Sequence, residues 1–381
     1  MRIRYQSVTR FTGMECGAAM KKVIEFLSTF VCLLVIGDYC SGLVIARAAE
    51  VDAIIGNVRS AEELFVNCDV SAATEYRRGK DPGDKHIVKR QSSETHMVSQ
   101  DGMMRVHSRE NITGGGDASQ DEEERIRAFD GKVTRVINNG IANIVDGPTV
   151  DSNAIRPHMI LLQGVTYPVP LSVLLQGYDA ISAYPGDVSP LKSREFDVTY
   201  LGQDKWNDLD CEKLALRHVS TKSNKVEEEF HVWLAVNRNY IPVKVIGFDY
   251  KWSKKLPKYE AEVGEFREVE PGMWFPVGAS SEINDAFALK QGRKISKISQ
   301  TYKVSDVDLN PTYPESYFQD VKFPDGTMVY DVDAAGRITK GRTVGDPPSS
   351  ANVSLRFWLI VVNVILLGTV VVGWLTWRFL R

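Results

Sequence analysis

The sequence is poor in cysteine and nearly neutral, which limits the kinds of protein that it encodes. It has five cysteines in 381 residues, and Cys16, Cys32 and Cys40 lie near the N-terminus. The formal net charge of −3 gives no indication of a nucleic-acid-binding surface. Cys68 and Cys211 either form one disulfide or remain two separate buried thiols. We favour separate thiols, because nothing in the sequence places the two residues together.

The motifs of the common hydrolases and metalloenzymes are also missing. There is no Gly-x-Ser-x-Gly elbow and no His-Glu-x-x-His motif. His96 and His107 flank one expected hairpin, but neither has a cysteine or carboxylate at ligand spacing, so we expect a solvated pair. Residues 306–310 resemble a calcium loop, yet Pro311 stands where that loop needs glycine. The sequence therefore predicts no metal, no cofactor and no enzymatic activity.

A long apolar run is present near the C-terminus. Residues 357–377 read FWLIVVNVILLGTVVVGWLTW and carry no charge. A helix needs about 20 such residues to cross the hydrocarbon core of a bilayer. Trp358, Trp374 and Trp377 stand near the ends of the run, where amphipathic rings prefer the interface. We predict a transmembrane helix over 356–378, followed by a short cytoplasmic tail, 379–381.

The N-terminal segment, residues 1–48, has the features of an export signal. A basic leader precedes an apolar core at 26–36, and Ala46-Arg47-Ala48 offers a small-x-small cleavage site. An uncleaved anchor is the alternative, although this core is too short for a comfortable membrane span. Export and one C-terminal membrane helix together predict a single-pass cell-membrane protein whose main domain lies in the periplasm or elsewhere outside the cytoplasm.

Residues 49–335 are expected to form one domain, joined to the membrane helix by a linker at 336–355. Apolar residues at helical spacing predict a helix over 49–65 and two short helices at 158–163 and 171–177. Alternation from Cys68 predicts the first strand, and a hairpin turning at Asp101-Gly102 follows. Loops are expected at 79–92 and 111–123.

Turn residues separate a series of strand-length segments over the rest of the domain. The expected strands lie at 125–129, 132–137, 141–145, 196–201, 211–219, 226–236, 241–250, 259–269, 274–283 and 294–304. Such a series is typical of an antiparallel meander joined by hairpins. A sheet this long covers its apolar face or curls into a barrel. The predicted fold is mainly β (α+β): a large curved antiparallel sheet or half-open β-barrel with a few covering helices.

A curled sheet that its own side chains do not fill encloses an apolar cavity. Acyl chains gain about 0.8 kcal/mol for each methylene buried in such a place. For the segment 231–236, the sequence leaves open whether Trp233 or the opposite face lines the cavity. A sheet packed solid against its helices, which acts as a binding or structural module, is the alternative. The candidate lining residues are Val70, Ala72, Val136, Val232, Trp233 and Leu234.

Several stretches between residues 60 and 303 share a pattern with a known family. They are SAEELFVNCDV (60–70), DGKVTRVI (130–137), RPHMILL and VPLSVLLQG (156–162 and 169–177), HVWLAVNRNYIPVKVIGFD (231–249) and PGMWFPVGAS (271–280). Together they resemble the periplasmic lipoprotein carriers typified by LolA, in particular membrane-tethered relatives among Planctomycetes. The resemblance implies a half-open β-barrel with helices as a lid, which binds lipid or lipoprotein acyl chains in its concavity.

The chain departs from the soluble carriers of this family in two ways. Those carriers have no membrane helix, and their Arg-Pro strand motif, which is tied to lid closure, has no clear match here; Arg109-Glu110-Asn111 is a poor substitute. A tethered domain that receives, holds or senses a lipidated partner at its own membrane is therefore expected in place of a shuttle. The same fold also serves regulators that sense envelope stress, so a sensor or scaffold that binds protein partners is the alternative function.

Overall fold

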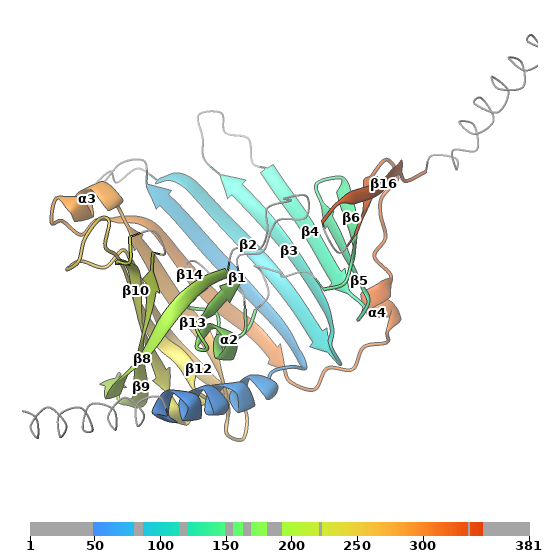
Figure 1. Ribbon diagram of the computed structural model, residues 1–381. Coiled ribbons are helices and arrows are strands. Elements are labelled where there is room, and N and C mark those ends of the chain that lie inside the picture. Colours follow the sequence, from blue (N-terminus) through green and yellow to red (C-terminus); the bar gives the residue numbers. More distant parts are fainter. Residues whose placement is uncertain are drawn as a thin grey trace, which may run out of the picture.

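One sheet of sixteen strands makes up most of the computed structural model, and it curves around a helix on its concave side (Figure 1). The structure describes residues 49–79, 87–113, 121–148, 155–162, 169–180, 193–220, 223–333 and 336–345. The expected signal segment and the expected transmembrane helix lie outside these residues. Among the residues described, no helix has both the length and the apolar character needed to cross a bilayer.

The strands follow the order β16-β15-β6-β5-β4-β3-β2-β1-β14-β13-β12-β11-β10-β9-β8-β7. β1 (Cys68–Gly79) pairs with β2 on one side and β14 on the other, so it joins the two halves of the sheet. β7 and β16 occupy the two edges, which leaves the sheet open. The predicted fold class is confirmed as a mainly β, open, curved sheet with few helices.

Hairpins connect most neighbouring strands, as the spacing of turn residues predicts. The first half of the sheet contains β2 (Ile87–Gln100), β3 (Met103–Thr113), β4 (Asp121–Phe129), β5 (Val133–Asn138) and β6 (Ile141–Asp146). The second half contains β7 (Tyr178–Ala180), β8 (Ser193–Trp206), β9 (Leu209–Val219), β10 (Val226–Ala235), β11 (Ile241–Asp249), β12 (Tyr259–Glu270), β13 (Met273–Asn284) and β14 (Ser296–Asp308). The helical segments besides residues 49–63 are α2 (Leu171–Leu174), η1 (Val236–Arg238), α3 (Ala286–Lys290) and α4 (Ser316–Gln319).

The two ends of the sheet are named here as they lie in Figure 1. The lower end holds the start of β1 at Cys68 and the β2–β3 turn at Asp101-Gly102. Both turn residues have positive φ, 52° and 78°, which is the geometry that Asp-Gly hairpin turns provide. The upper end holds the end of β1 at Gly79 and the end of β3 at Thr113.

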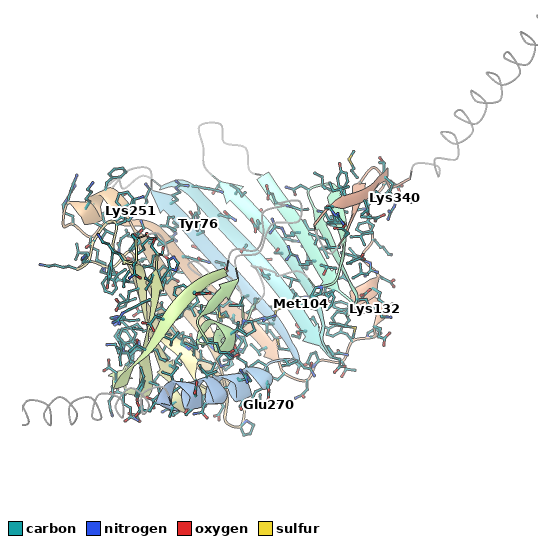
Figure 2. The ribbon with its side chains drawn as sticks, viewed as in Figure 1. Tyr76, Met104, Lys132, Lys251, Glu270 and Lys340 are labelled. Atoms are coloured by element: carbon teal, nitrogen blue, oxygen red, sulfur yellow. The ribbon has the colours of Figure 1, made fainter. Side chains whose placement is uncertain are left out.

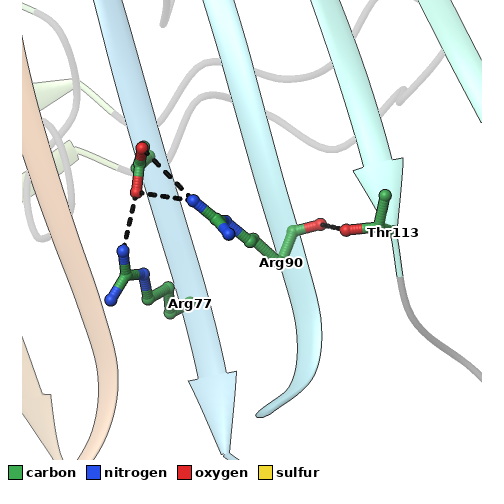
Figure 3. Close-up of polar contacts among 4 residues, drawn as sticks. Arg77, Arg90 and Thr113 are labelled. Atoms are coloured by element: carbon green, nitrogen blue, oxygen red, sulfur yellow. Dashed lines mark hydrogen bonds and ion pairs between the residues drawn. The ribbon is translucent and has the colours of Figure 1, made fainter.

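Close to the upper end, polar contacts cross β1, β2 and β3 (Figure 3). The Glu75 carboxylate pairs with Arg77 at 2.9 Å and with Arg90 at 3.4 Å. The Thr113 hydroxyl donates to the Arg90 carbonyl at 3.2 Å. These ion pairs are exposed and contribute little to stability. The Glu75–Arg90 pair and the Thr113–Arg90 hydrogen bond join neighbouring strands in register where the sheet has few apolar residues.

Side-chain alternation divides the sheet into a concave face, which meets the helix, and an outer face. Val70 and Ala72 of β1 are buried in the main core with Ile54 and Val58 of the helix. Leu214, Val232 and Val245 extend the same core across β9, β10 and β11. The helix predicted over 49–65 from apolar spacing is confirmed, since residues 49–63 are helical.

Several strands are longer than the sequence predicts. β2 begins at Ile87 and β3 ends at Thr113, so strand structure extends into the expected loops at 79–92 and 111–123. Polar residues occupy successive positions there, as at Ser92 and Ser93, which are both partly buried. Neither face is fully apolar, so the alternation that identifies a strand is absent.

The predicted helix at 158–163 is wrong for the residues described there. Residues 157–162 form turns, in which Met159 N–H donates to the Arg156 carbonyl and Leu162 N–H to the Met159 carbonyl, both at 2.9 Å. Such i→i−3 bonds are tighter than those of an α-helix. The run 157–162 is buried throughout, so its apolar residues carry no helical period.

After β14 the chain returns to the first half of the sheet. β15 (Met328–Val332) pairs in parallel with β6, an arrangement that a hairpin meander does not contain. β16 (Ile338–Thr343) pairs with β15 and lies within the segment expected to be linker, 336–355. The residues of β16 are almost all exposed, and an edge strand of this kind lacks apolar alternation.

Candidate functional site

The helix over 49–63 covers the lower end of the concave face because its apolar residues recur on one side. Ile54, Ile55 and Val58 are buried against the sheet. Phe65 follows the helix and packs edge-to-face on Phe275 of β13, with ring centroids 6.0 Å apart. These contacts fix the helix over the sheet without filling all the space beneath its C-terminal end.

A cavity of about 470 Å³ remains between this helix, residues 156–158 and 170–173, and the lower ends of β1 to β4. Half of its apolar lining residues are methionine or phenylalanine, and Met104 is labelled in Figure 2. Methionine adapts its shape to irregular ligands because its side chain is unbranched and flexible. The apolar residues that line the cavity are Phe65, Val66, Met97, Met103, Met104, Phe129, Pro148, Pro157, Pro170 and Val173.

Charged groups of both signs border the same cavity. Arg59, Glu63 and Arg156 are exposed and line it together with Glu62 and Ser172. A space with apolar walls and a charged rim suits an amphipathic ligand, whose chain is buried while its polar group stays near water. The two guanidinium groups are suited to a carboxylate or phosphate.

Glu62 joins the helix to α2 at this site. Its carboxylate accepts hydrogen bonds from Leu171 N–H at 2.6 Å and from Ser172 N–H at 3.3 Å. Burial raises the pKa of Glu62 above its ordinary value, although these hydrogen bonds and the charge of Arg156 act in the opposite direction. The first N–H groups of α2 thus obtain the acceptor that a helix start requires.

His158 forms part of the cavity wall and is buried, with 2% of its surface exposed. Its Nε2–H donates to the Asn239 carbonyl at 2.8 Å, and its ring packs edge-to-face on Phe65 with centroids 5.7 Å apart. Burial lowers the pKa of His158 to about 4. The imidazole is therefore neutral at pH 7 and acts as a backbone anchor for residues 155–162.

Cys68 and Cys211 are separate free thiols, as favoured from the sequence. Cys68 lies in the main core and lines the cavity, whereas Cys211 lies in a cluster on the outer face. Burial raises the pKa of Cys68 to about 12 and that of Cys211 to about 11. Both thiols stay protonated at neutral pH, so neither has the reactivity of a thiolate.

The structure places four of the six candidate lining residues on the concave face but within packed core. Val70, Ala72, Val232 and Leu234 are at most 5% exposed, and all four belong to the main core. None of the four lines the 470 Å³ cavity. In this part of the sheet the helix and residues 155–162 fill the concavity, so the packing is that of an ordinary protein interior.

The other two candidates occupy different environments. Trp233 lies on the outer face with Cys211 and Val243, and its indole N–H donates to Asp204 at 2.9 Å. Val232 and Leu234 thus belong to the main core and Trp233 to the outer cluster, and neither side of this strand lines the 470 Å³ cavity. Val136 of β5 is partly buried and stands opposite Arg127 and Asn143 in register, away from the cavity lining.

The residues that line the cavity were not identified from the sequence. Met103 and Met104 directly follow the Asp101-Gly102 turn, and Phe129 directly precedes the Asp130-Gly131 turn. Large apolar residues next to hairpin turns are a recognisable signal, because they place apolar surface at one end of a sheet. The sequence alone does not show that a helix covers that end.

His96 and His107 lie directly opposite each other on β2 and β3. Carboxylates from the adjoining strands approach them: His96 Nε2 is 2.7 Å from Asp69, and His107 Nε2 is 2.6 Å from Glu124. Neither carboxylate stands at ligand spacing in the sequence, because both partners come from other strands, and the two histidines are partly exposed, at 38% and 31% of their side-chain surface. Within the described ranges no group of three metal-ligating side chains is assembled.

No protein-family model matches the chain, and no curated protein matches it in sequence. Solved structures do match it. A DUF1329 family protein from Desulfovibrio piger has 10% identity and a TM-score of 0.38, with 70% of this chain and 96% of that chain covered.

Two further structures show the same likeness. A LolA superfamily protein from Nitrosomonas europaea has 16% identity and a TM-score of 0.33, covering 70% of this chain and 96% of its own. LprF from Mycobacterium bovis has 9% identity and a TM-score of 0.25, covering 70% of this chain and 97% of its own. All three are similarities to solved structures at low sequence identity.

Proposed function

We propose that this chain is a membrane-tethered, non-cytoplasmic domain that holds lipid or the acyl chains of lipoproteins in the cavity beneath the helix over 49–63. The observation that carries the proposal is the cavity of about 470 Å³ with its methionine-rich apolar wall. Ligand pockets commonly have volumes of about 300–1,000 Å³. The tether and the location outside the cytoplasm are inferred from the sequence of the two terminal segments.

The energetics of such a site favour an acyl chain. Each buried methylene contributes about 0.8 kcal/mol, so about ten methylenes offset the cost of immobilising a flexible ligand. Arg59 and Arg156 lie at the rim, where they can meet the negative group of the ligand. The chain enters the apolar space and the polar group stays beside the two guanidinium groups.

We further propose that the domain binds its ligand without chemical conversion. The buried groups at the site are engaged in structure: Glu62 accepts the N–H groups of α2, and His158 donates to a backbone carbonyl. Recovery of an intact ligand after prolonged incubation with the full chain is the expected result. Release of free fatty acid or another product would contradict this part of the proposal.

A charge placed in the cavity tests the binding proposal. We expect Met104→Glu in the full chain to weaken uptake of a fluorescent fatty acid by more than about tenfold, because an unpaired carboxylate is costly in an apolar wall. Met328→Glu is the matched control, since Met328 is 45% exposed on β15 and does not line the cavity. Circular dichroism of both variants reports whether they fold. Equal uptake by the two folded variants would disprove acyl binding at this site.

A further inference from the structure

The upper end of the sheet carries an aromatic pair, in which Phe287 is exposed and Trp252 is partly buried. Phe287 of α3 is 67% exposed, which is unusual for a large apolar side chain. Its ring packs against that of Trp252, with centroids 5.8 Å apart. The Asn284 side chain donates to the Pro257 carbonyl at 3.0 Å and so fastens the start of α3 to the loop that holds Trp252. The pair is therefore a fixed feature of the surface.

Lysine and arginine surround this aromatic pair. The segments 250–258 and 285–297 together contain eight Lys or Arg residues and one Asp, a net charge of +7 in a chain whose formal net charge is −3. We call these two segments the upper basic patch. Its exposed cations are Lys251, Lys254, Lys255, Lys290, Arg293 and Lys294.

Two carboxylates at the upper basic patch, Glu260 and Asp285, are already engaged. Glu260 pairs with Lys294. Asp285 pairs with Lys297 at 3.3 Å and accepts from Ala288 N–H at 2.9 Å. Among the described residues, no carboxylate forms an ion pair with Lys251, Lys254, Lys255 or Lys290. The positive charge of the patch is thus available to an external anion.

Strand register places the upper basic patch at the same end of the sheet as the last described residues. β13 reaches this end at Asn284, opposite Ser296 of β14. β16 reaches it at Thr343, opposite Met328 of β15. Figure 2 shows Lys251 and Lys340 toward this end and Glu270 at the other. The last described residues, which end at Gly345, therefore lie at the same end of the sheet as the patch, and the predicted transmembrane helix follows them in the sequence.

We propose that the upper basic patch docks on an anionic phospholipid surface, with Trp252 and Phe287 entering the headgroup region. Lysines attract anionic lipids, and aromatic rings prefer the boundary between headgroups and acyl chains. An exposed phenylalanine packed on a partly buried tryptophan among lysines fits a lipid surface better than an acidic protein, which would not require the aromatic groups. The contacts above support the patch itself. The position of the membrane tether rests on the proposed function.

Trp252 supplies the readout for a test. The full chain is reconstituted in phosphatidylcholine bilayers with and without phosphatidylglycerol, and tryptophan quenching by brominated acyl chains is measured. The signal of Trp252 is the difference between the wild-type chain and Trp252→Phe. We expect this signal to be quenched in the anionic bilayer, to be largely unquenched in the neutral one, and to recover at high salt, which screens exposed charge.

Charge reversal at the two ends of the sheet provides the comparison. Lys254→Glu with Lys255→Glu is expected to remove most of the lipid-dependent quenching. Lys132→Glu with Lys205→Glu, at the lower end, is the matched control and is expected to leave it intact. Retained quenching in the first variant, or a Trp252 signal that no bilayer quenches, would overturn the proposal, and the latter result is the one expected for an acidic protein partner. Fatty-acid uptake measured on the same variants separates failure of the patch from failure of the cavity.

Discussion

The carboxylate of Glu62 accepts a hydrogen bond from the backbone N–H of Leu171 at 2.6 Å, across 109 residues of sequence. This contact fastens the covering helix to α2 at the edge of the cavity. We expect Glu62→Ala to lower the free energy of unfolding by about 1–3 kcal/mol, because it leaves N–H groups of α2 without an acceptor. Urea titration of the full chain measures the change.

The neighbouring residue is the control for that substitution. Glu63 also borders the cavity but is exposed. We expect Glu63→Ala to change the stability by less than about 0.5 kcal/mol, as is usual for surface positions. Equal effects of the two substitutions would show that the contact with α2 is unimportant for stability.

Acid is expected to destabilise the cavity wall through His158. The folded chain takes up a proton at this residue only near pH 4, whereas an unfolded histidine does so near 6.5. Between these values the unfolded chain binds more protons, so the free energy of unfolding falls as the pH drops from 6.5 toward 4, by up to about 3 kcal/mol.

The histidine contribution is isolated by substitution. His158→Gln keeps a side-chain N–H for the Asn239 carbonyl but does not titrate, so the variant is expected to lose this part of the pH dependence. His218→Gln is the control, because His218 is only partly buried. Unfolding midpoints at pH 7 and pH 5 provide the comparison. An unchanged pH dependence in His158→Gln would contradict the assignment.

Gly247 of β11 lies beneath two aromatic residues of the core. A Cβ atom at this position would stand 2.7 Å from the Phe230 ring and 3.2 Å from Cβ of Tyr259. We expect Gly247→Ala to cost about 1–3 kcal/mol by overpacking. Gly264→Ala in β12 is the matched control, since the nearest heavy atom there is 4.0 Å away. Thermal unfolding of the two variants decides the point, and similar melting temperatures would disagree with the packing described.

Trp233 is expected to matter for stability and not for ligand uptake. Trp233→Phe removes the hydrogen bond to Asp204 and should cost about 1–2 kcal/mol. Fatty-acid affinity should be unchanged, because the ring lies on the outer face, away from the cavity. Asp204→Asn, alone and combined with Trp233→Phe, completes a double-mutant cycle whose coupling energy isolates the bond. A loss of affinity in Trp233→Phe would place the ring at the ligand.

The parts of the fold that sequence predicts are those with a simple local cause. The helix over 49–63 follows from apolar spacing, and the hairpin at Asp101-Gly102 follows from residues that adopt positive φ. β16 and the start of β2 escape prediction because no consistent face of either is buried. The parallel pairing of β15 with β6 depends on where a distant segment docks, and local pattern contains no information about that.

The site was harder to predict than the fold. Val232 and Leu234 are apolar residues of a strand, as any concave lining would be, yet they are fully buried in the packed core that includes residues of the helix. Met104 and Phe129 line the cavity because the cover ends before it reaches them. Whether a part of the concave face is packed or lines a cavity depends on how far the helix extends over the sheet. The alternation of side chains within a strand contains no information about that distance.

The cavity and the upper basic patch lie at opposite ends of the sheet. β1 alone has 12 residues, and strands rise about 3.3 Å per residue, so roughly 40 Å separates the two ends. A domain standing on its upper end therefore presents the cavity to the aqueous phase, remote from the leaflet beneath it. For the proposed function, loading then depends on collision with a donor that brings the acyl chain through water, and its rate follows the concentration of that donor and not the area of the supporting membrane.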